Sequence, residues 1–294
     1  ATFQAYYFPS YKEQSAKRRV AWVGGLQALF LDGELNLRED SDGDGVLGAD
    51  DEKINLFYDG SATVVQRLNA DGTIKETVPF TRIRPIWDAK NWLAGLSDAQ
   101  VTTQRNYGDT TGRHILTWMD QDLGAGPDGR VDAGEVVSFD KANVVDGDAY
   151  RILNVADAAS GENLVNYIRG SDAIPGMRSR TVRMDGDSQA RVWRLGDIVH
   201  SSPVVVGRPG DGYDVAYRDI SYTDFRNQYL YRRQVVYAGA NDGMIHAFNA
   251  GFYSLGSSAF TKGGTHPVTG AAVAEYDLGA ELWAYVPRNL LPHL

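Results

Sequence analysis

The chain has 294 residues, enough for one large β domain or two ordinary domains with a sizeable core. Its 43% hydrophobic and 23% charged residues are typical of a folded globular protein and not of a disordered one. The 38 acidic and 29 basic residues give a net charge of −9, which disfavours nucleic acid and anionic lipid as partners. The absence of cysteine excludes disulfides, thiolate metal sites and cysteine nucleophiles.

The first strong pattern in chain order is RRVAWVGGLQALFLD, from Arg18 to Asp32. A basic pair, an apolar run with an aromatic residue, glycine and a second apolar run predict a β-hairpin with a short turn. The sequence before it starts with Ala and has no signal-peptide pattern, and no apolar run reaches transmembrane length. We therefore expect a processed product or an excised fragment of a longer protein.

An aspartate-rich stretch, DSDGDGVLGADD, follows this apolar run and matches the spacing of a calcium-binding loop. Gly45 falls at position 6, where the chain must turn sharply. The ligand positions 1, 3, 5, 7 and 12 are taken by Asp40, Asp42, Asp44, the Val46 carbonyl and Asp51. The flanks read as strands, so we expect a structural Ca²⁺ loop, residues 40–51, inserted in a β scaffold. The alternative is a solvated Asp/Gly turn, in which the clustered carboxylates would repel one another.

Residues 60–190 read as an irregular, insertion-rich region of mixed secondary structure. Apolar runs predict strands within residues 63–69, 73–80, 113–120 and 135–140. Apolar residues at helical spacing predict helices within residues 85–97 and around Glu162–Ile168.

A second acidic stretch, from Asp120 to Glu135, fits the calcium-loop pattern only in its second half. Asp128 at position 5 is followed by Gly129, and position 7 would offer the Arg130 carbonyl. Positions 9 and 12 are then Asp132 and Glu135. Positions 1 and 3 fall on glycines, so Asp120 and Asp122 would serve only in an expanded loop. A second, weaker Ca²⁺ site and an ordinary turn both remain open.

The last third of the chain carries the clearest strands. SSPVVVG predicts one strand, and QVVYAGANDGMIHAFNA, from Gln234 to Ala250, predicts a hairpin with an Asn-Asp-Gly turn. HAFNAG and LGAELWAYVP, joined across an inserted loop at residues 251–279, resemble the repeat of quinoprotein-type propeller blades. We therefore predict a mainly β chain, residues 1–294, forming one β-propeller-type domain, complete or partial, with loop and short helical insertions. The hairpins predicted at Arg18–Asp32 and Gln234–Ala250 would be two repeats of one blade pattern; the alternative is that these two hairpins are unrelated.

The residues give no pattern for catalysis. The five histidines form no metal-ligand spacing, and no G-x-S-x-G nucleophile elbow is present. His200 precedes Ser201, but neighbouring residues of a strand point to opposite faces. His246 alternates with apolar residues, so we expect it to be packed in the core. We predict that the chain is not an enzyme.

Several strings together resemble the PilC/PilY family of type IV pilus biogenesis factors and tip-associated adhesins. They are WVGGLQALFLDGELNLREDSDGDG, VNYIRGSD, WRLGDIVHSSPVVVGRP, VVYAGANDGMIHAFNAG and ELWAYVPRNLL. The resemblance implies an exported protein of the periplasm, the outer membrane surface or the pilus tip (the fimbrium), with Ca²⁺ as its ion. It implies pilins or minor pilins, a host or abiotic surface, and the rest of its own propeller as partners.

The same resemblance limits what is carried over. The family's later Asp-rich regulatory loop lies beyond this sequence, and Arg169–Asp172 places a Ser inside what would be an Arg-Gly-Asp motif. Two other functions stay open: a quinoprotein-type dehydrogenase, which also uses propeller blades and calcium, and a structural subunit of another surface filament.

Overall fold

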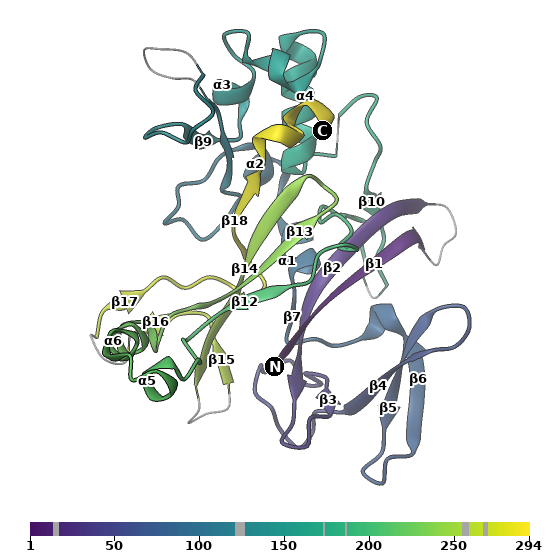
Figure 1. Ribbon diagram of the computed structural model, residues 1–294. Coiled ribbons are helices and arrows are strands. Elements are labelled where there is room, and N and C mark those ends of the chain that lie inside the picture. Colours follow the sequence, from purple (N-terminus) through teal and green to yellow (C-terminus); the bar gives the residue numbers. More distant parts are fainter. Residues whose placement is uncertain (14–17, 121–126, 173, 186, 255–258, 267–269) are drawn as a thin grey trace.

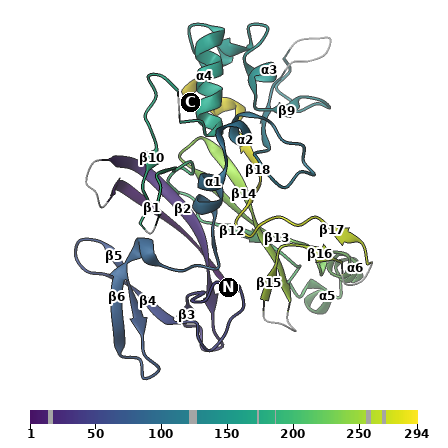
Figure 2. The ribbon, with the colours of Figure 1, turned by 180° about the vertical axis from the view of Figure 1, so that it is seen from behind.

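The computed structural model describes residues 1–13, 18–120, 127–172, 174–185, 187–254, 259–266 and 270–294. The chain is mainly β, as predicted. Its described strands form two seven-stranded sheets and two small two-stranded sheets. Figure 1 shows three lobes. Strands β3–β6 lie at the lower right, helices α5 and α6 at the lower left, and α3, α4 and the C-terminus at the top. The view from behind shows the same arrangement (Figure 2).

The first large sheet is built by the N-terminal part of the chain, in the order β1-β2-β3-β4-β5-β6, with β7 paired to β2. Its strands are β1 (Thr2–Lys12), β2 (Arg19–Leu31), β3 (Leu37–Arg38), β4 (Lys53–Tyr58), β5 (Thr63–Leu68), β6 (Ile74–Pro79) and β7 (Trp87–Asp88). The β5 and β6 strands were predicted, whereas β1 and β4 were not.

The predicted hairpin at Arg18–Asp32 is wrong. Residues 19–31 form one continuous strand that pairs with β1 from Thr2↔Leu29 to Lys12↔Arg19. The glycines serve close packing and not a turn: a Cβ on Gly25 would lie 2.2 Å from the Tyr6 ring. A Cβ on Gly24 would meet backbone atoms on both sides at 2.7–2.9 Å.

The second large sheet has the order β12-β13-β14-β18-β8-β9, with β15 paired to β14. Its strands are β12 (Val204–Val206), β13 (Gln234–Ala240), β14 (Met244–Ser254), β18 (Glu281–Val286), β8 (Ile115–Trp118), β9 (Val136–Ser138) and β15 (Ala259–Thr261). The β13–β14 hairpin is confirmed, with Ala240 opposite Met244 and Gly243 at φ +86° in the turn. β14 and β18 are antiparallel neighbours, as the joined strings suggested. The parallel pairing of β18 with β8 was not predicted.

The helices and small sheets decorate these strands. The helices are α1 (Ala89–Gly95), α2 (Asp98–Thr102), α3 (Lys141–Val144), α4 (Ala158–Arg169), α5 (Tyr213–Ala216) and α6 (Ile220–Tyr229). Short 3₁₀ helices span Phe80–Arg82, Ala149–Leu153 and Arg288–His293. The small sheets pair β10 (Thr181–Val182) with β11 (Arg191–Val192), and β16 (Gly264–Thr265) with β17 (Ala272–Val273). None of the described helices has the length and apolar composition needed to span a membrane.

Two predicted helices have clear end signals. The Asp88 carboxylate accepts a hydrogen bond from the Lys90 N–H and caps α1. The Asp157 carboxylate caps α4 in the same way, and Gly170 ends that helix at φ +124°. The sequence placed this second helix correctly but made it too short, because its first turn, Ala-Ala-Ser-Gly, has no large apolar residue to show the helical spacing.

The main core joins the two large sheets. Leu26 of β2, Leu93 of α1, Val236 of β13 and Phe248 of β14 belong to one buried cluster. A separate buried cluster of Leu29, Ile54 and Val65 packs against the first sheet beside the paired strands β3 and β4. The acidic loop between β3 and β4 is therefore attached to a packed base.

Candidate metal centre

The loop from Asp40 to Asp51 connects two antiparallel strands. Arg38 of β3 faces Lys53 of β4, and the Glu39 N–H donates to the Glu52 carbonyl at 3.0 Å. The two ends of the loop thus follow directly on a strand ladder, and not on helices as in an EF-hand domain. The strand flanks expected from the sequence are confirmed.

Three aspartates of this loop converge. One carboxylate oxygen from each of Asp40, Asp42 and Asp44 lies within 4.8 Å of the others. Asp40 is buried, with 6% of its surface exposed, whereas Asp42 and Asp44 are exposed. Such a set of oxygen atoms, closed on one side and open on the other, has the chemistry that a hard divalent cation requires.

Backbone hydrogen bonds hold this convergence in place. Asp40 Oδ1 accepts from the Gly43 N–H at 2.9 Å, and its Oδ2 accepts from the Gly45 N–H at 3.1 Å. Asp44 Oδ1 accepts from the Val46 N–H at 2.7 Å. Gly43 and Gly45 adopt φ of +78° and +74°, a region that glycine enters without steric cost. Each carboxylate oxygen keeps a lone pair for a further partner.

Asp51, the expected position-12 ligand, stands outside the group of three aspartates. It is only 3% exposed, and its two oxygens accept from the Ser41 and Gly48 N–H groups, both at 2.8 Å. Val46, whose carbonyl is the expected position-7 ligand, forms an isolated bridge with Ala259 across to the second sheet. Three of the five predicted ligands are thus brought together, and Asp51 ties the two ends of the loop.

Electrostatics favour a cation at this site. Burial raises the pKa of Asp40, and the negative charges of Asp51 and Asp42 raise it further, although two backbone N–H groups act in the opposite direction. The carboxylates therefore disfavour one another's charged forms, and a bound divalent cation would remove that repulsion.

A buried network of ion pairs and hydrogen bonds holds the two ends of the loop. Glu39 is fully buried, and its carboxylate accepts from Arg67 Nε at 2.8 Å and from the Arg84 backbone N–H at 3.0 Å. Arg84 Nη1 donates to the Ser41 carbonyl at 3.2 Å, and Arg38 Nε donates to the Asp51 carbonyl at 2.9 Å. Sequence reasoning missed this network. One signal in the sequence could have indicated it. Side chains alternate along a strand, so if Asp40 faces the loop, the neighbouring Glu39 points to the opposite side.

The second acidic stretch connects β8 and β9 in a comparable way. Asp120 and Glu135 are buried, with 8% and 4% of their surfaces exposed. Asp128, Arg130 and Asp132 are exposed. Asp122 lies outside the described residues.

The two loops share a hydrogen-bond pattern. Asp120 Oδ2 accepts from the Gly129 N–H, position 6, at 3.1 Å, as Asp40 does from Gly45. Asp128 accepts from the Arg130 N–H at 2.8 Å, and Glu135 accepts from the Asp132 N–H at 2.9 Å, which repeats the pairs at positions 5–7 and 9–12 of the first loop. In the part of the chain that the structure describes, however, only the first loop brings three acidic side chains together.

His246 is buried as expected, but within a charged network. Its Nδ1 lies 2.8 Å from Glu281 Oε1, and its Nε2 lies 3.1 Å from Asp242 Oδ1. Arg113 Nη2 completes the network at 2.7 Å from Glu281 Oε1. Sequence reasoning missed these partners, because Glu281 and Arg113 are far from His246 in the chain.

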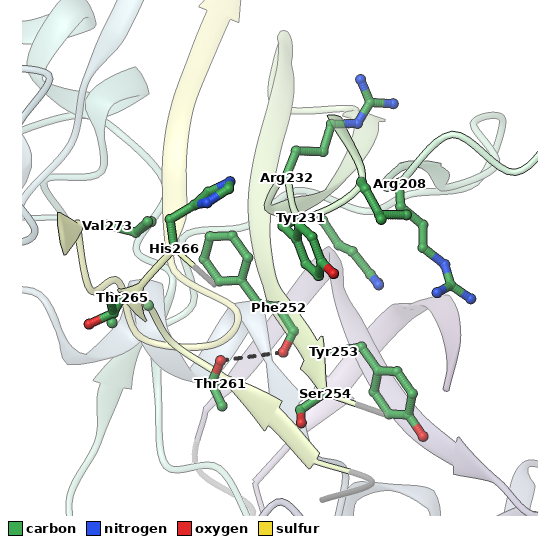
Figure 3. Close-up of a pocket in the computed structure, with 14 residues that line it drawn as sticks. Arg208, Tyr231, Arg232, Phe252, Tyr253, Ser254, Thr261, Thr265, His266 and Val273 are labelled. Carbon is green, nitrogen blue, oxygen red and sulfur yellow. Dashed lines mark hydrogen bonds between the residues drawn. The ribbon is translucent and has the colours of Figure 1, made fainter. Parts of the chain in front are cut away.

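A cavity of about 610 Å³ lies beside β14 and β16, far from the acidic loops in sequence. Figure 3 shows Tyr231, Phe252 and His266 at its wall, with Arg208 and Arg232 to one side. Ser254 and Thr265 also line it. The converging carboxylates of Asp40, Asp42 and Asp44 make the first acidic loop the candidate site.

No family model and no solved structure matches the sequence. A type IV pilus biogenesis factor PilY1 homolog of Xylella fastidiosa is 34% identical over 140 residues, 47% of this chain and 9% of the relative. PilY1 of Pseudomonas aeruginosa strain PAK is 30% identical over 212 residues, 66% of this chain and 18% of the relative. PilY1 of strain UCBPP-PA14 is 38% identical over 100 residues, 33% of this chain and 8% of the relative.

These findings confirm the resemblance to the PilC/PilY family. The matched parts span less than a fifth of the length of each of these relatives.

Proposed function

We propose that this PilY1-like chain is a segment of a type IV pilus biogenesis factor and pilus-tip adhesin. The observation that carries the proposal is its similarity to PilY1 proteins of two bacteria. These relatives are named as pilus biogenesis factors and not as dehydrogenases, which favours a non-enzymatic role over the quinoprotein alternative. The chain then acts outside the cytoplasm, in the periplasm, at the outer membrane surface or at the pilus tip.

The second sheet supports a propeller. Strands β12, β13, β14 and β18 are successive antiparallel neighbours, which is the arrangement of a four-stranded propeller blade. We propose that they form one blade and that the remaining blades come from the rest of the propeller. The parallel β8 strand then attaches the middle region to the outside of this blade.

The first acidic loop is proposed to bind Ca²⁺ through Asp40, Asp42 and Asp44, with the Val46 carbonyl as a further oxygen donor. Oxygen donors that converge beside glycines at positive φ support this assignment. The ion would neutralise the loop and fix the end of the β3–β4 hairpin, so its role is to brace the fold. The second loop would be a weaker site, because its described acidic groups do not form a cluster of three.

The partners proposed are pilins or minor pilins and a host or abiotic surface. The test uses the full-length protein in its own bacterium. Deleting its gene should abolish or strongly reduce surface pili and attachment, and the wild-type gene should restore both. Asp42→Asn with Asp44→Asn should restore them less well than the matched double change Asp211→Asn with Asp224→Asn, which removes two exposed aspartates elsewhere.

Normal pili and attachment in the deletion strain would contradict the biogenesis role. Equal rescue by both double variants would leave that role intact and contradict the importance of calcium. Dye reduction by the protein with pyrroloquinoline quinone and an alcohol would instead support the dehydrogenase.

A further inference from the structure

A second cavity, of about 250 Å³, is lined by three arginines and lies away from the acidic loops. Arg178, Arg180 and Arg194 contribute to its wall, together with Trp22 of β2 and the Asp242 turn. Figures 1 and 2 show β2, β10 and the β13–β14 turn converging in this part of the molecule. We call this cavity the arginine pocket. In a chain with net charge −9, such a gathering of cations calls for a specific explanation.

Arg180 is buried without full compensation of its charge. It is 7% exposed, its Nη2 donates to two backbone carbonyls, and its guanidinium lies 4.1 Å from the centre of the Tyr167 ring. Its Nε has no hydrogen-bond partner among the described atoms. Nε forms only a long ion pair, 3.7 Å from Asp172 Oδ1, and that carboxylate also accepts hydrogen bonds from two hydroxyls and two backbone N–H groups.

Arg194 and Arg178 are held through neutral groups. Arg194 is 5% exposed, and it donates from Nε to the Gly170 carbonyl at 2.9 Å and from Nη1 to the Leu93 carbonyl at 2.8 Å. Arg178 is exposed at the rim and donates from Nη1 to the Ala21 carbonyl at 2.6 Å. Carbonyl oxygens position a guanidinium, but they carry no full negative charge to balance it.

The acidic groups nearby are already occupied. Asp242 accepts from the Gly196 N–H at 3.0 Å and pairs with His246, and Glu281 pairs with His246 and Arg113. Burial lowers the pKa of Arg194 to about 10, and the positive charges of Arg113 and Arg180 add to this. The wall of the pocket thus carries three guanidinium groups and one carboxylate side chain, that of Asp242, which is already paired with His246.

Trp22 marks the rim of the pocket. It is 56% exposed and adopts φ +53°, a conformation that bulky residues rarely take and that concentrates at binding sites. Trp22 directly follows Ala21, whose carbonyl accepts the hydrogen bond from Arg178. A flat apolar surface thus lies beside the cationic pocket.

We propose that the arginine pocket binds an oxyanion, a carboxylate or phosphate group, between the guanidiniums of Arg178, Arg180 and Arg194. Guanidinium donors match the geometry of both groups, and a buried cation gains most from a directly bonded anion. The oxyanion comes either from a free small molecule or from an acidic side chain of a protein partner. The apolar ring of Trp22 would contact what carries the oxyanion.

The test measures binding to the purified whole chain by calorimetry at fixed ionic strength in chloride. The probes are inorganic phosphate, acetate, and a short end-capped peptide with one glutamate between apolar residues; the same peptide with glutamine is the control. Arg178→Gln should weaken binding about tenfold, the effect of losing one charge-assisted hydrogen bond. Arg208→Gln, an exposed arginine outside the pocket, should have no effect.

Binding of phosphate or acetate would assign the site to free oxyanions, and binding of only the glutamate peptide would assign it to an acidic partner segment. No binding of any probe would overturn the proposal. Equal binding of the glutamate and glutamine peptides, or equal weakening by Arg178→Gln and Arg208→Gln, would overturn it as well. Because Arg178 is exposed, its variant is expected to fold, and circular dichroism checks this.

Discussion

We expect the free energy of unfolding to fall as the pH rises from 6.5 to about 9, because a buried charged His246 stabilises the folded chain. Burial alone lowers the pKa of His246, but the carboxylates of Asp242 and Glu281 raise it from 6.5 to about 9. Since the folded value exceeds the unfolded one, the stabilisation is fully present below pH 6.5 and is lost as the pH rises through 9. The difference corresponds to about 3 kcal/mol.

The assay is urea unfolding followed by tryptophan fluorescence at several pH values between about 6 and about 9.5, with calcium held constant. In wild type the extrapolated stability should decline across this range. His246→Gln should lower stability at the acidic end and flatten the profile, whereas His200→Gln, at an exposed position, should leave the profile unchanged. A wild-type profile that is flat, or that rises with pH, would refute the charged state of His246 in the folded protein.

Three further predictions concern the acidic loop, its base and the long β2 strand. Calcium at about a hundred times its dissociation constant should stabilise the chain by about 3 kcal/mol, measured as a rise in Tm, and Asp42→Asn with Asp44→Asn should abolish this rise. Glu39→Gln removes the buried carboxylate shared by Arg67 and Arg84 and leaves Arg67 paired only with Glu52 and Glu76, so it should cost about 1.5–3 kcal/mol in urea unfolding; a loss below about 1 kcal/mol would contradict the network. Gly25→Ala should lower Tm by several degrees, because its Cβ would lie 2.2 Å from a tyrosine ring; an unchanged Tm would show that the ring moves freely.

Local features of the fold were predictable from sequence, and long-range ones were not. The Asn241-Asp242-Gly243 turn and the helix before Gly170 carry their own turn and end signals, so both were found. The glycines of β2 misled, because close packing and turning use the same residue and only the three-dimensional neighbours distinguish them.

The candidate site divides in the same way. The spacing of Asp40, Asp42 and Asp44 is local, and the structure brings these three carboxylates together. The support from Arg67 and Arg84 is not local, because each lies on a different part of the first sheet or its connections. The arginine pocket is likewise assembled from separate segments that no single stretch of sequence reveals.

The parallel pairing of β8 with β18 has a consequence for how the protein is made. Ile115 lies opposite Ala284, so about 170 residues must be synthesised before β8 meets its partner. At roughly 5–20 residues per second, β8 waits about 10–30 seconds for β18 to emerge. Contacts this distant in sequence also form slowly. The sheet that joins the middle region to β18 is therefore completed late in synthesis, after the local pairing of β8 with β9 has become possible.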